Sequence, residues 1–129
     1  ILLMYYRNKS KYFKRKNTFY RPWGKYTNLF SGNNFLVKQI HVKAKGILSL
    51  QKHFHRSEHW VVTSGTPKIT LNKKFFFKKP GETIFIPKGA IHRIENLNTK
   101  PVKIMEAQLG SILSETDIVR YEDVYGRAN

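Results

Sequence analysis

Apolar and polar residues alternate over short distances along most of this chain, and the runs are separated by glycine, proline and asparagine. The runs are rich in β-branched and aromatic residues, which favour strands. They cover residues 35–37, 40–42, 59–63, 68–71, 75–77, 83–86 and 102–107. Short strands at regular spacing, separated by turn residues, predict an all-β sandwich or barrel. This part of the chain has no long 3.6-residue period of the kind that an amphipathic helix requires.

Both ends of the chain differ from this β-rich middle. Residues 1–16 contain six basic residues, four aromatic residues and no acid. Near the C-terminus, Ser114 precedes Glu115 and Asp117, which resembles a weak capping box and predicts a short helix or turn. We therefore divide the 129 residues into a basic arm or linker, 1–18, and one barrel domain, 19–127.

The composition permits a buried core and limits the chemistry. Hydrophobic residues make up 40% of the chain, and there is no cysteine. Disulfides, zinc–thiolate sites and thiol nucleophiles are therefore excluded, and any metal must be bound by histidine, carboxylate or amide oxygen. The absence of cysteine is compatible with the cytoplasm, where we expect the protein to be. No apolar run approaches the roughly 20 residues of a membrane span, and the first four residues are too few for a signal-peptide core.

The formal net charge of +16 is large for this length and favours anionic partners. Lysine and asparagine are abundant along the whole chain, so we attribute more of the charge to a general lysine bias than to one functional patch. The basic and aromatic residues of the segment 1–16 are compatible with single-stranded nucleic acid. We prefer a linker, or an arm that packs on the barrel, because no nucleic-acid-binding motif accompanies the segment.

Four of the five histidines lie in two groups that suggest a metal site. His53, His55 and His59 share one short stretch with Glu58, and His92 follows a Pro-x-Gly turn. Imidazole nitrogen and carboxylate oxygen are common ligands of divalent transition metals. The alternative is a set of surface or core histidines without a metal, because a His-x-His pair alone is a weak signal.

Strand geometry shows how these residues can converge. Alternate residues of a strand point to the same face, so Gln51 and His53 share a face and His55 extends that row. Glu58 lies across a bend and can turn back toward the same face. A ligand from a distant strand, His92, would complete the shell.

The spacing around these residues resembles the two motifs of the cupin superfamily. The second motif is matched at every position, by Gly81, Pro87, Gly89, His92 and Asn96. The first is matched with one departure, by Gln51 in place of the usual first histidine and then by His53, Glu58 and Gly65. The resemblance implies a cupin-type double-stranded β-helix, a jelly-roll barrel, with a metal bound by Gln51, His53, Glu58 and His92.

An alternative register of the first motif takes His53 and His55 as the paired ligands. In that register, Glu58 stands one residue too early for the acid of the motif, or else His59 takes the place of the acid. We prefer the register that starts at Gln51 because it keeps the spacing on both sides of the acid. His55 and His59 then become residues around the ligands or contacts to a substrate.

A narrower resemblance covers residues 20–127. Several blocks, in order, are similar to the type II mannose-6-phosphate isomerase domain: 21–26, 48–60, 86–89, 92–96, 106–110 and 117–127. That domain is usually the C-terminal part of a bifunctional enzyme whose N-terminal part is a mannose-1-phosphate guanylyltransferase. This sequence has no Gly-rich nucleotide-binding segment, so we do not expect transferase activity. One acid of the family pattern is absent from residues 114–117, which puts any role of that acid in doubt.

The resemblance implies a metal-dependent interconversion of mannose 6-phosphate and fructose 6-phosphate, which feeds activated-mannose and polysaccharide synthesis. Zinc is the first choice of metal, with cobalt, manganese, nickel and magnesium as alternatives. The reaction needs a base, and the candidates are Glu95, Glu106 and His59. The substrate needs a phosphate anchor, for which Arg56, Arg93 and Lys52 flank the ligands. Lys38 and Lys103 are weaker candidates.

Three functions compete on the sequence alone. The first is the sugar-phosphate isomerase, without its usual transferase partner. The second is a non-catalytic cupin that binds a sugar or sugar phosphate, a remnant of the bifunctional enzyme. The third is a nucleic-acid-binding or membrane-associated module that uses the basic arm. We prefer the first because the site residues are intact. A homodimer through unpaired sheet edges is compatible with all three.

Overall fold

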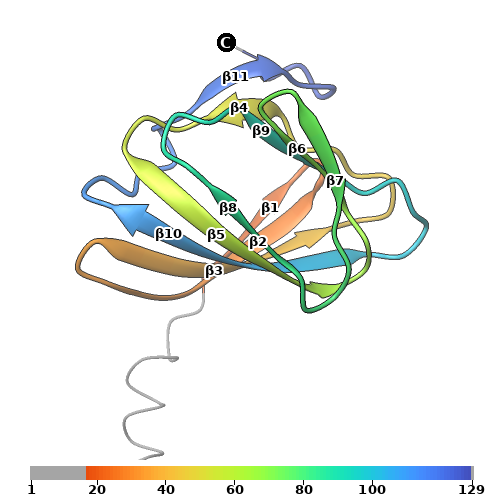
Figure 1. Cartoon of the computed structure of the whole chain (residues 1–129), viewed down its shortest axis with the longest axis horizontal. Coiled ribbons are helices and arrows are strands. Elements are labelled where there is room, and N and C mark those ends of the chain that lie inside the picture. Colours follow the sequence, from red (N-terminus) through yellow and green to blue (C-terminus); the bar gives the residue numbers. More distant parts are fainter. Residues whose placement is uncertain (1–16, 129) are drawn as a thin grey trace, which may run out of the picture.

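The computed structural model describes residues 17–128, which form two antiparallel sheets (Figure 1). The first sheet has the order β1-β2-β3-β10-β5-β8, which span Asn17–Arg21, Gly24–Gly32, Phe35–Val42, Val102–Gly110, Arg56–Ser64 and Thr83–Ile86. The second has the order β11-β4-β9-β6-β7, which span Val119–Glu122, Leu50–Lys52, His92–Glu95, Lys68–Leu71 and Lys74–Phe77. These residues include no helix, and hence none that could cross a membrane. The prediction of an all-β domain is confirmed.

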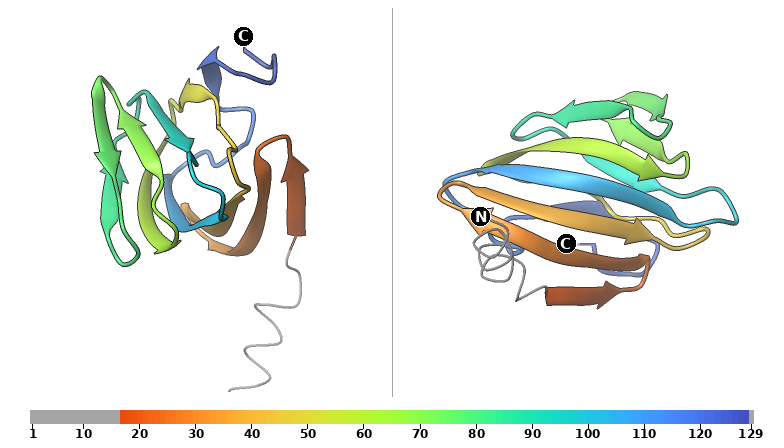
Figure 2. Two further views of the ribbon diagram at one scale, coloured as in Figure 1. Left: turned by 90° about the vertical axis from the view of Figure 1, so that its right-hand side faces the viewer. Right: turned by 90° about the horizontal axis from the view of Figure 1, so that it is seen from below.

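Strands that are distant in sequence alternate within each sheet. In the first sheet β10 lies between β3 and β5, and in the second β9 lies between β4 and β6. The two sheets face each other around a common interior in Figure 1, and the right-hand view of Figure 2 shows the first sheet as one broad layer. This interleaving of the two halves of the chain is the double-stranded β-helix that the cupin resemblance implies.

All seven predicted runs lie in strands, but five strands were not predicted. Residues 35–37 and 40–42 belong to the single strand β3, because the buried Lys38 continues the alternation between them. Strands β1, β4, β9 and β11 are short or polar, and β2 lacks a clear apolar alternation. The Ser114 segment forms a turn and not a helix, with the Asp117 amide donating to the Ser114 carbonyl. The predicted arm, 1–18, falls mostly outside the described residues, and β1 begins at Asn17.

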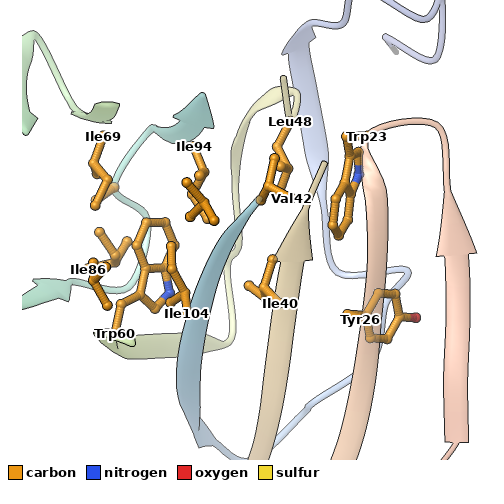
Figure 3. Close-up of a cluster of buried hydrophobic side chains, with 13 residues drawn as sticks. Trp23, Tyr26, Ile40, Val42, Leu48, Trp60, Ile69, Ile86, Ile94 and Ile104 are labelled. Atoms are coloured by element: carbon orange, nitrogen blue, oxygen red, sulfur yellow. The ribbon is translucent and has the colours of Figure 1, made fainter. Parts of the chain in front are cut away.

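The barrel interior is apolar at one end and polar at the other. Along β5, the buried Trp60 and Val62 follow the buried Arg56 and Glu58. The same division occurs on β3 and β10, where isoleucines and valines face one half and charged or amide side chains face the other. Figure 3 shows the apolar residues gathered from both sheets. The residues that carry chemistry therefore line one end of a barrel whose other end is a hydrophobic core.

The C-terminal segment encloses the polar end. The Asp117 carboxylate accepts the backbone amides of Phe54 and His55, each at 2.9 Å. Strand β11 then pairs with β4, and Arg93 donates to the Leu48 carbonyl and to Glu122. Residues near the end of the chain thus lie directly beside the first cupin-like motif.

Candidate metal centre

Three buried donors from separate parts of the chain meet at the polar end of the barrel. His53 follows β4, Glu58 lies on β5 and His92 begins β9. One donor atom from each lies within 4.8 Å of the others. The His53 Nε2 is 3.4 Å from Glu58 Oε1, and the His92 Nε2 is 3.7 Å from Glu58 Oε2. Two imidazoles and one carboxylate in this arrangement suit a divalent transition metal.

Both histidines are held in the neutral form that binds metals. Burial, together with the positive charge of Arg56, lowers the pKa of His53 to about 3. Burial also lowers the pKa of His92 to about 4, against the opposing effect of its hydrogen bond to the Ala90 carbonyl. The contacts of both rings with Glu58 are therefore not ion pairs at neutral pH. Neutral imidazoles can bind a metal without first losing a proton.

Hydrogen bonds on the opposite ring nitrogens fix the orientation of both imidazoles. The His53 Nδ1 lies 2.7 Å from the Asp117 carbonyl, and the His92 Nδ1 lies 3.0 Å from the Ala90 carbonyl. A carbonyl only accepts hydrogen bonds, so each Nδ1 carries the proton and each Nε2 presents a lone pair. A carbonyl behind the ring is the usual support of a metal-binding histidine.

Arg56 lies against two of the three donors. Its guanidinium donates to the His53 Nε2 at 3.1 Å and to Glu58 Oε1 at 3.2 Å. It also donates to the Ser114 carbonyl at 3.3 Å. A metal bound by His53 and Glu58 would replace the first two of these hydrogen bonds.

Gln51 lies beside this group. It is the cross-strand neighbour of His92 in the β4–β9 pair and lines the same cavity. Its Nε2 donates to the Ser49 carbonyl at 3.3 Å, which leaves the amide oxygen available as a ligand. The assignment of Gln51 as the fourth ligand remains a prediction.

The turn of the second motif is bonded to the first motif. Gly89 has a φ of +80°, a left-handed conformation that glycine adopts without strain, and its amide donates to the His53 carbonyl at 2.9 Å. The amide of Ala90 closes the turn on the Pro87 carbonyl. This contact holds the segment before His92 against the segment that carries His53.

The donors line an open cavity of about 610 Å³, a volume that includes solvent at the opening. Among its lining residues are three carboxylates, Glu58, Glu106 and Glu115, and five cationic side chains, Arg21, Lys38, Arg56, Arg120 and Arg127. The excess of cationic groups favours an anionic ligand.

Glu106 is the second buried carboxylate of this cavity. Burial and the neighbouring charge of Glu58 raise the pKa of Glu106 to about 7, while Lys38 opposes that effect. Its Oε1 accepts a hydrogen bond from Trp60 Nε1 at 3.4 Å, and its Oε2 lies 3.8 Å from Lys38 Nζ. Glu106 can therefore exchange a proton near neutral pH.

The other predicted site residues lie outside the cavity lining. On β9, His92 faces the interior, and Arg93 and Glu95 lie at the positions of the opposite face. His59 is on the outer face of β5 and packs against Phe85 in a tilted arrangement, with 4.6 Å between the ring centroids. The remaining residues outside the lining are Lys52, His55 and the weaker candidate Lys103.

The row that was expected to run from Gln51 through His53 to His55 ends at His53. The chain bends at Phe54 and His55, whose amides the Asp117 carboxylate binds. His55 is consequently exposed, and neither His55 nor His59 belongs to the clustered donors. The geometry favours the register that starts at Gln51.

Sequence reasoning assigned no site role to several residues that line the cavity: Arg21, Glu115, Arg120 and Arg127. Three of them lie in blocks that carry the isomerase resemblance, 21–26 and 117–127. Their position in those blocks was the signal that could have identified them.

The fold and the buried histidine–glutamate–histidine group together define a cupin with a candidate metal centre. The cupin domain of Cnp3 from Schizosaccharomyces pombe superposes with a TM-score of 0.64 at 18% identity, over 67% of this chain and 64% of that one. Residues 8–123 match the family described as mannose-6-phosphate isomerase C-terminal, and the chain belongs to this family.

Curated relatives support the same family. The chain is 46% identical over 110 residues to the alginate biosynthesis protein AlgA of Pseudomonas syringae pv. tomato, covering 85% of this chain and 23% of the relative. It is 47% identical over 108 residues to the mannose-1-phosphate guanylyltransferase ManC of Salmonella typhimurium, covering 84% and 22%. The chain thus spans less than a quarter of the length of these relatives.

Proposed function

We propose that this chain is a metal-dependent isomerase that interconverts mannose 6-phosphate and fructose 6-phosphate. The observation that carries the proposal is the joint presence, in one cavity, of a three-donor group and the buried Glu106. Membership of the mannose-6-phosphate isomerase family supports the choice of substrate. The names of the relatives, which include alginate and xanthan biosynthesis proteins, support a role in supplying activated mannose for polysaccharides. A phosphorylated sugar substrate also agrees with a cytoplasmic location.

The reaction moves a proton between two adjacent carbons of the open-chain sugar through an enediol. It requires a base beside the carbon acid and positive charge beside the oxygen that becomes negative. His53, Glu58 and His92, with Gln51 as the proposed fourth ligand, would hold a divalent cation that supplies this charge as a Lewis acid. Zinc is our first choice because the donors are nitrogen and oxygen and the set is small.

We assign the proton transfer to Glu106. Among the three predicted bases it is the one in the cavity lining, whereas Glu95 and His59 are not. Its raised pKa of about 7 suits a group that must accept and return a proton near neutral pH. Lys38 stands beside it and also pairs with Glu115 at 2.8 Å, so a cation remains close to Glu106 when it is ionised. Arg56 would contact the substrate next to the ligands.

The direct test is an isomerase assay on the purified chain. Mannose 6-phosphate is supplied with zinc, cobalt, manganese, nickel or magnesium in turn, and fructose 6-phosphate is measured. We expect turnover with at least one metal and none after chelation. A protein that binds metal and shows no turnover with any of them would contradict the isomerase proposal and favour a sugar-binding cupin.

The ligand set is tested by Glu58→Gln with Glu82→Gln as its matched control. Glu82 lies in a surface turn, where it accepts the Lys79 amide, and it is not part of the cavity lining. We expect Glu58→Gln to weaken metal affinity by more than about 10-fold and to remove turnover, since even groups behind metal ligands have effects of that size. Metal content after dialysis measures the first effect. Unchanged content in Glu58→Gln would refute the proposed ligands.

A further inference from the structure

The five cationic side chains of the cavity differ in whether they already have a partner. Arg56 pairs with Glu58, Lys38 with Glu106 and Glu115, and Arg127 with Asp123. The pairs leave two cations, Arg21 and Arg120. Arg21 donates to the Tyr20 carbonyl and to the Tyr26 hydroxyl, at 2.9 and 3.3 Å.

The Arg120 side chain has no hydrogen bond or ion pair within residues 17–128, and its Nε is buried without a partner although the residue as a whole is half-buried. A buried nitrogen that lacks an acceptor is costly to maintain, because this N–H has given up water and gained no hydrogen bond in return. An anion that enters the cavity would supply the missing acceptor. The planar guanidinium suits the oxygens of a phosphate group in particular.

The strand register sets the distance between Arg120 and the metal centre. Arg120 is the cross-strand neighbour of Gln51 in the β11–β4 pair, and Gln51 is the neighbour of His92 in the β4–β9 pair. Cross-strand neighbours point to the same face, and all three residues line the cavity. Two strand spacings, or about 10 Å, separate the backbones of Arg120 and His92. An extended sugar with a terminal phosphate fits this span, with its reacting carbons at the metal centre.

We propose that Arg120 forms a phosphate subsite at the β11 edge of the cavity, where it binds the phosphate of the sugar-phosphate substrate. The proposal rests on the proposed function for the identity of that ligand. It replaces Arg93 and Lys52, the anchors expected from sequence position, because neither of them lines the cavity. Arg120 is a binding residue in this scheme and takes no part in the proton transfer.

The test compares Arg120→Gln with the unmodified chain and with Lys68→Gln as the matched control. Lys68 is a cation on β6 of the same sheet that contacts Phe75 and lies outside the cavity lining. Calorimetry measures the affinity for inorganic phosphate, first with zinc and then after chelation. We expect Arg120→Gln to weaken phosphate binding by about 10- to 100-fold in both states, the range of a lost charge-assisted hydrogen bond. Lys68→Gln should change it less than about twofold, because Lys68 lies outside the cavity lining.

Arg120→Lys is a second variant that keeps the test usable if Arg120→Gln does not fold. Thermal unfolding of each protein shows whether it is folded. Lysine keeps the charge but loses the planar pair of donors, so its phosphate affinity should lie between those of the other two proteins. The proposal would be overturned if a folded Arg120→Gln or Arg120→Lys variant bound phosphate as tightly as the unmodified chain does. Phosphate binding that depends on zinc and not on Arg120 would overturn it as well.

The subsite and the isomerase activity can fail separately. If the unmodified chain binds phosphate through Arg120 but turns over no substrate, the proposed function fails and the subsite stands. If turnover occurs and Arg120→Gln leaves the KM for mannose 6-phosphate unchanged, the subsite fails and the function stands. Support for both is a KM raised by about 10-fold or more in Arg120→Gln with a smaller change in kcat.

Discussion

Asp123 shows how a single carboxylate can organise the end of the chain. Its two oxygens accept the amides of Tyr125 and Arg127 and two further hydrogen bonds from the Arg127 guanidinium. The side chain of Asp123 is fully buried, whereas that of Arg127 is 25% exposed. This turn holds Arg127 in the cavity lining, and the Tyr125 hydroxyl accepts the Ile47 amide. Asp123 thus positions part of the cavity without entering it.

Replacing Asp123 with asparagine should destabilise the fold by about 1–3 kcal/mol at pH 7, the range for hydrogen bonds to charged groups. The hydrogen bond from the Arg127 side chain holds the pKa of Asp123 below its ordinary value, against the opposing effect of burial. A lowered pKa means that the stabilisation is present above the usual aspartate range and is lost as the pH falls through the lowered value. Urea unfolding of both proteins at pH 7 and at progressively lower pH measures the difference.

The matched control for Asp123→Asn is Glu122→Gln. Glu122 is the residue before Asp123, and its replacement removes an ion pair with Arg93. The Glu122 side chain is 66% exposed, so we expect a change below about 1 kcal/mol. A difference between the Asp123 variant and the unmodified chain that does not shrink at low pH would contradict the assigned role.

For single residues, the spacing of histidines and acids in the sequence was enough to predict three that the structure brings together: His53, Glu58 and His92. It was not enough to separate inward from outward residues on β9, because strand β9 itself was not predicted. The expected base Glu95 thus falls on the alternate face. The block 117–127 could have singled out Arg120, but the sequence could not show that its Nε lacks a partner, which is a property of the folded chain.

Among the elements, strands β5 and β10 determine the geometry of the polar end. They pair in one register from Ile104 opposite Val62 to Gly110 opposite Arg56, after a register shift between Lys103 and Ile104. At that last pair the backbones approach so closely that a Cβ on Gly110 would overlap the His55 carbonyl and the Arg56 Cα. The glycine therefore lets β10 run beside the start of the strand that carries Arg56 and Glu58.

Gly110→Ala should consequently push the start of β5 away from β10. We expect a loss of about 1–3 kcal/mol of stability, the usual cost of overpacking, and a weaker affinity for metal because Glu58 is displaced. Thermal unfolding and metal titration measure the two effects. Ser111→Ala, at the next and exposed position, is the control and should change neither. If Gly110→Ala is destabilised but binds metal as tightly as the unmodified chain, the displacement at the start of β5 does not reach Glu58.

The elements that sequence patterns predicted are the long or strongly apolar ones. Strand β4 has three residues and is held by its neighbours β9 and β11, so its formation depends on pairing more than on local preference. The same applies to β11, whose place is set by the contacts of Asp117 and Arg93. Asn96 of the second motif has a structural role, because its amide donates to three carbonyls in the loops around β3 and β10.

The whole molecule combines a hydrophobic half with a charged half and carries a net charge of +16. Six of its basic residues lie in the segment 1–16, which is outside the described residues. The cavity accounts for only a small part of the charge.

A chain that starts at Asn17 should keep its fold and the proposed metal affinity, since all strands within the described residues 17–128 and all three clustered donors are retained. If the basic segment is a polyanion-binding arm, this shorter chain should elute from heparin at clearly lower salt, because the salt dependence follows the number of cations engaged. The comparison is a full-length chain in which four lysines in and beside β7 are replaced by neutral residues: Lys73, Lys74, Lys78 and Lys79. Equal elution of the shortened and the full chain would exclude the arm as the main contributor.

The contacts of Arg56 have a consequence for how the protein would acquire the proposed metal. Glu58 already has a counterion inside the barrel, and the guanidinium occupies part of the space between the donors. A buried carboxylate with such a partner does not need a metal to offset the cost of burial. We therefore expect the barrel to assemble during synthesis without waiting for zinc. Metal loading would then be an exchange of one cation for another in a folded protein, and we expect it to be reversible and to follow the supply of metal in the cell.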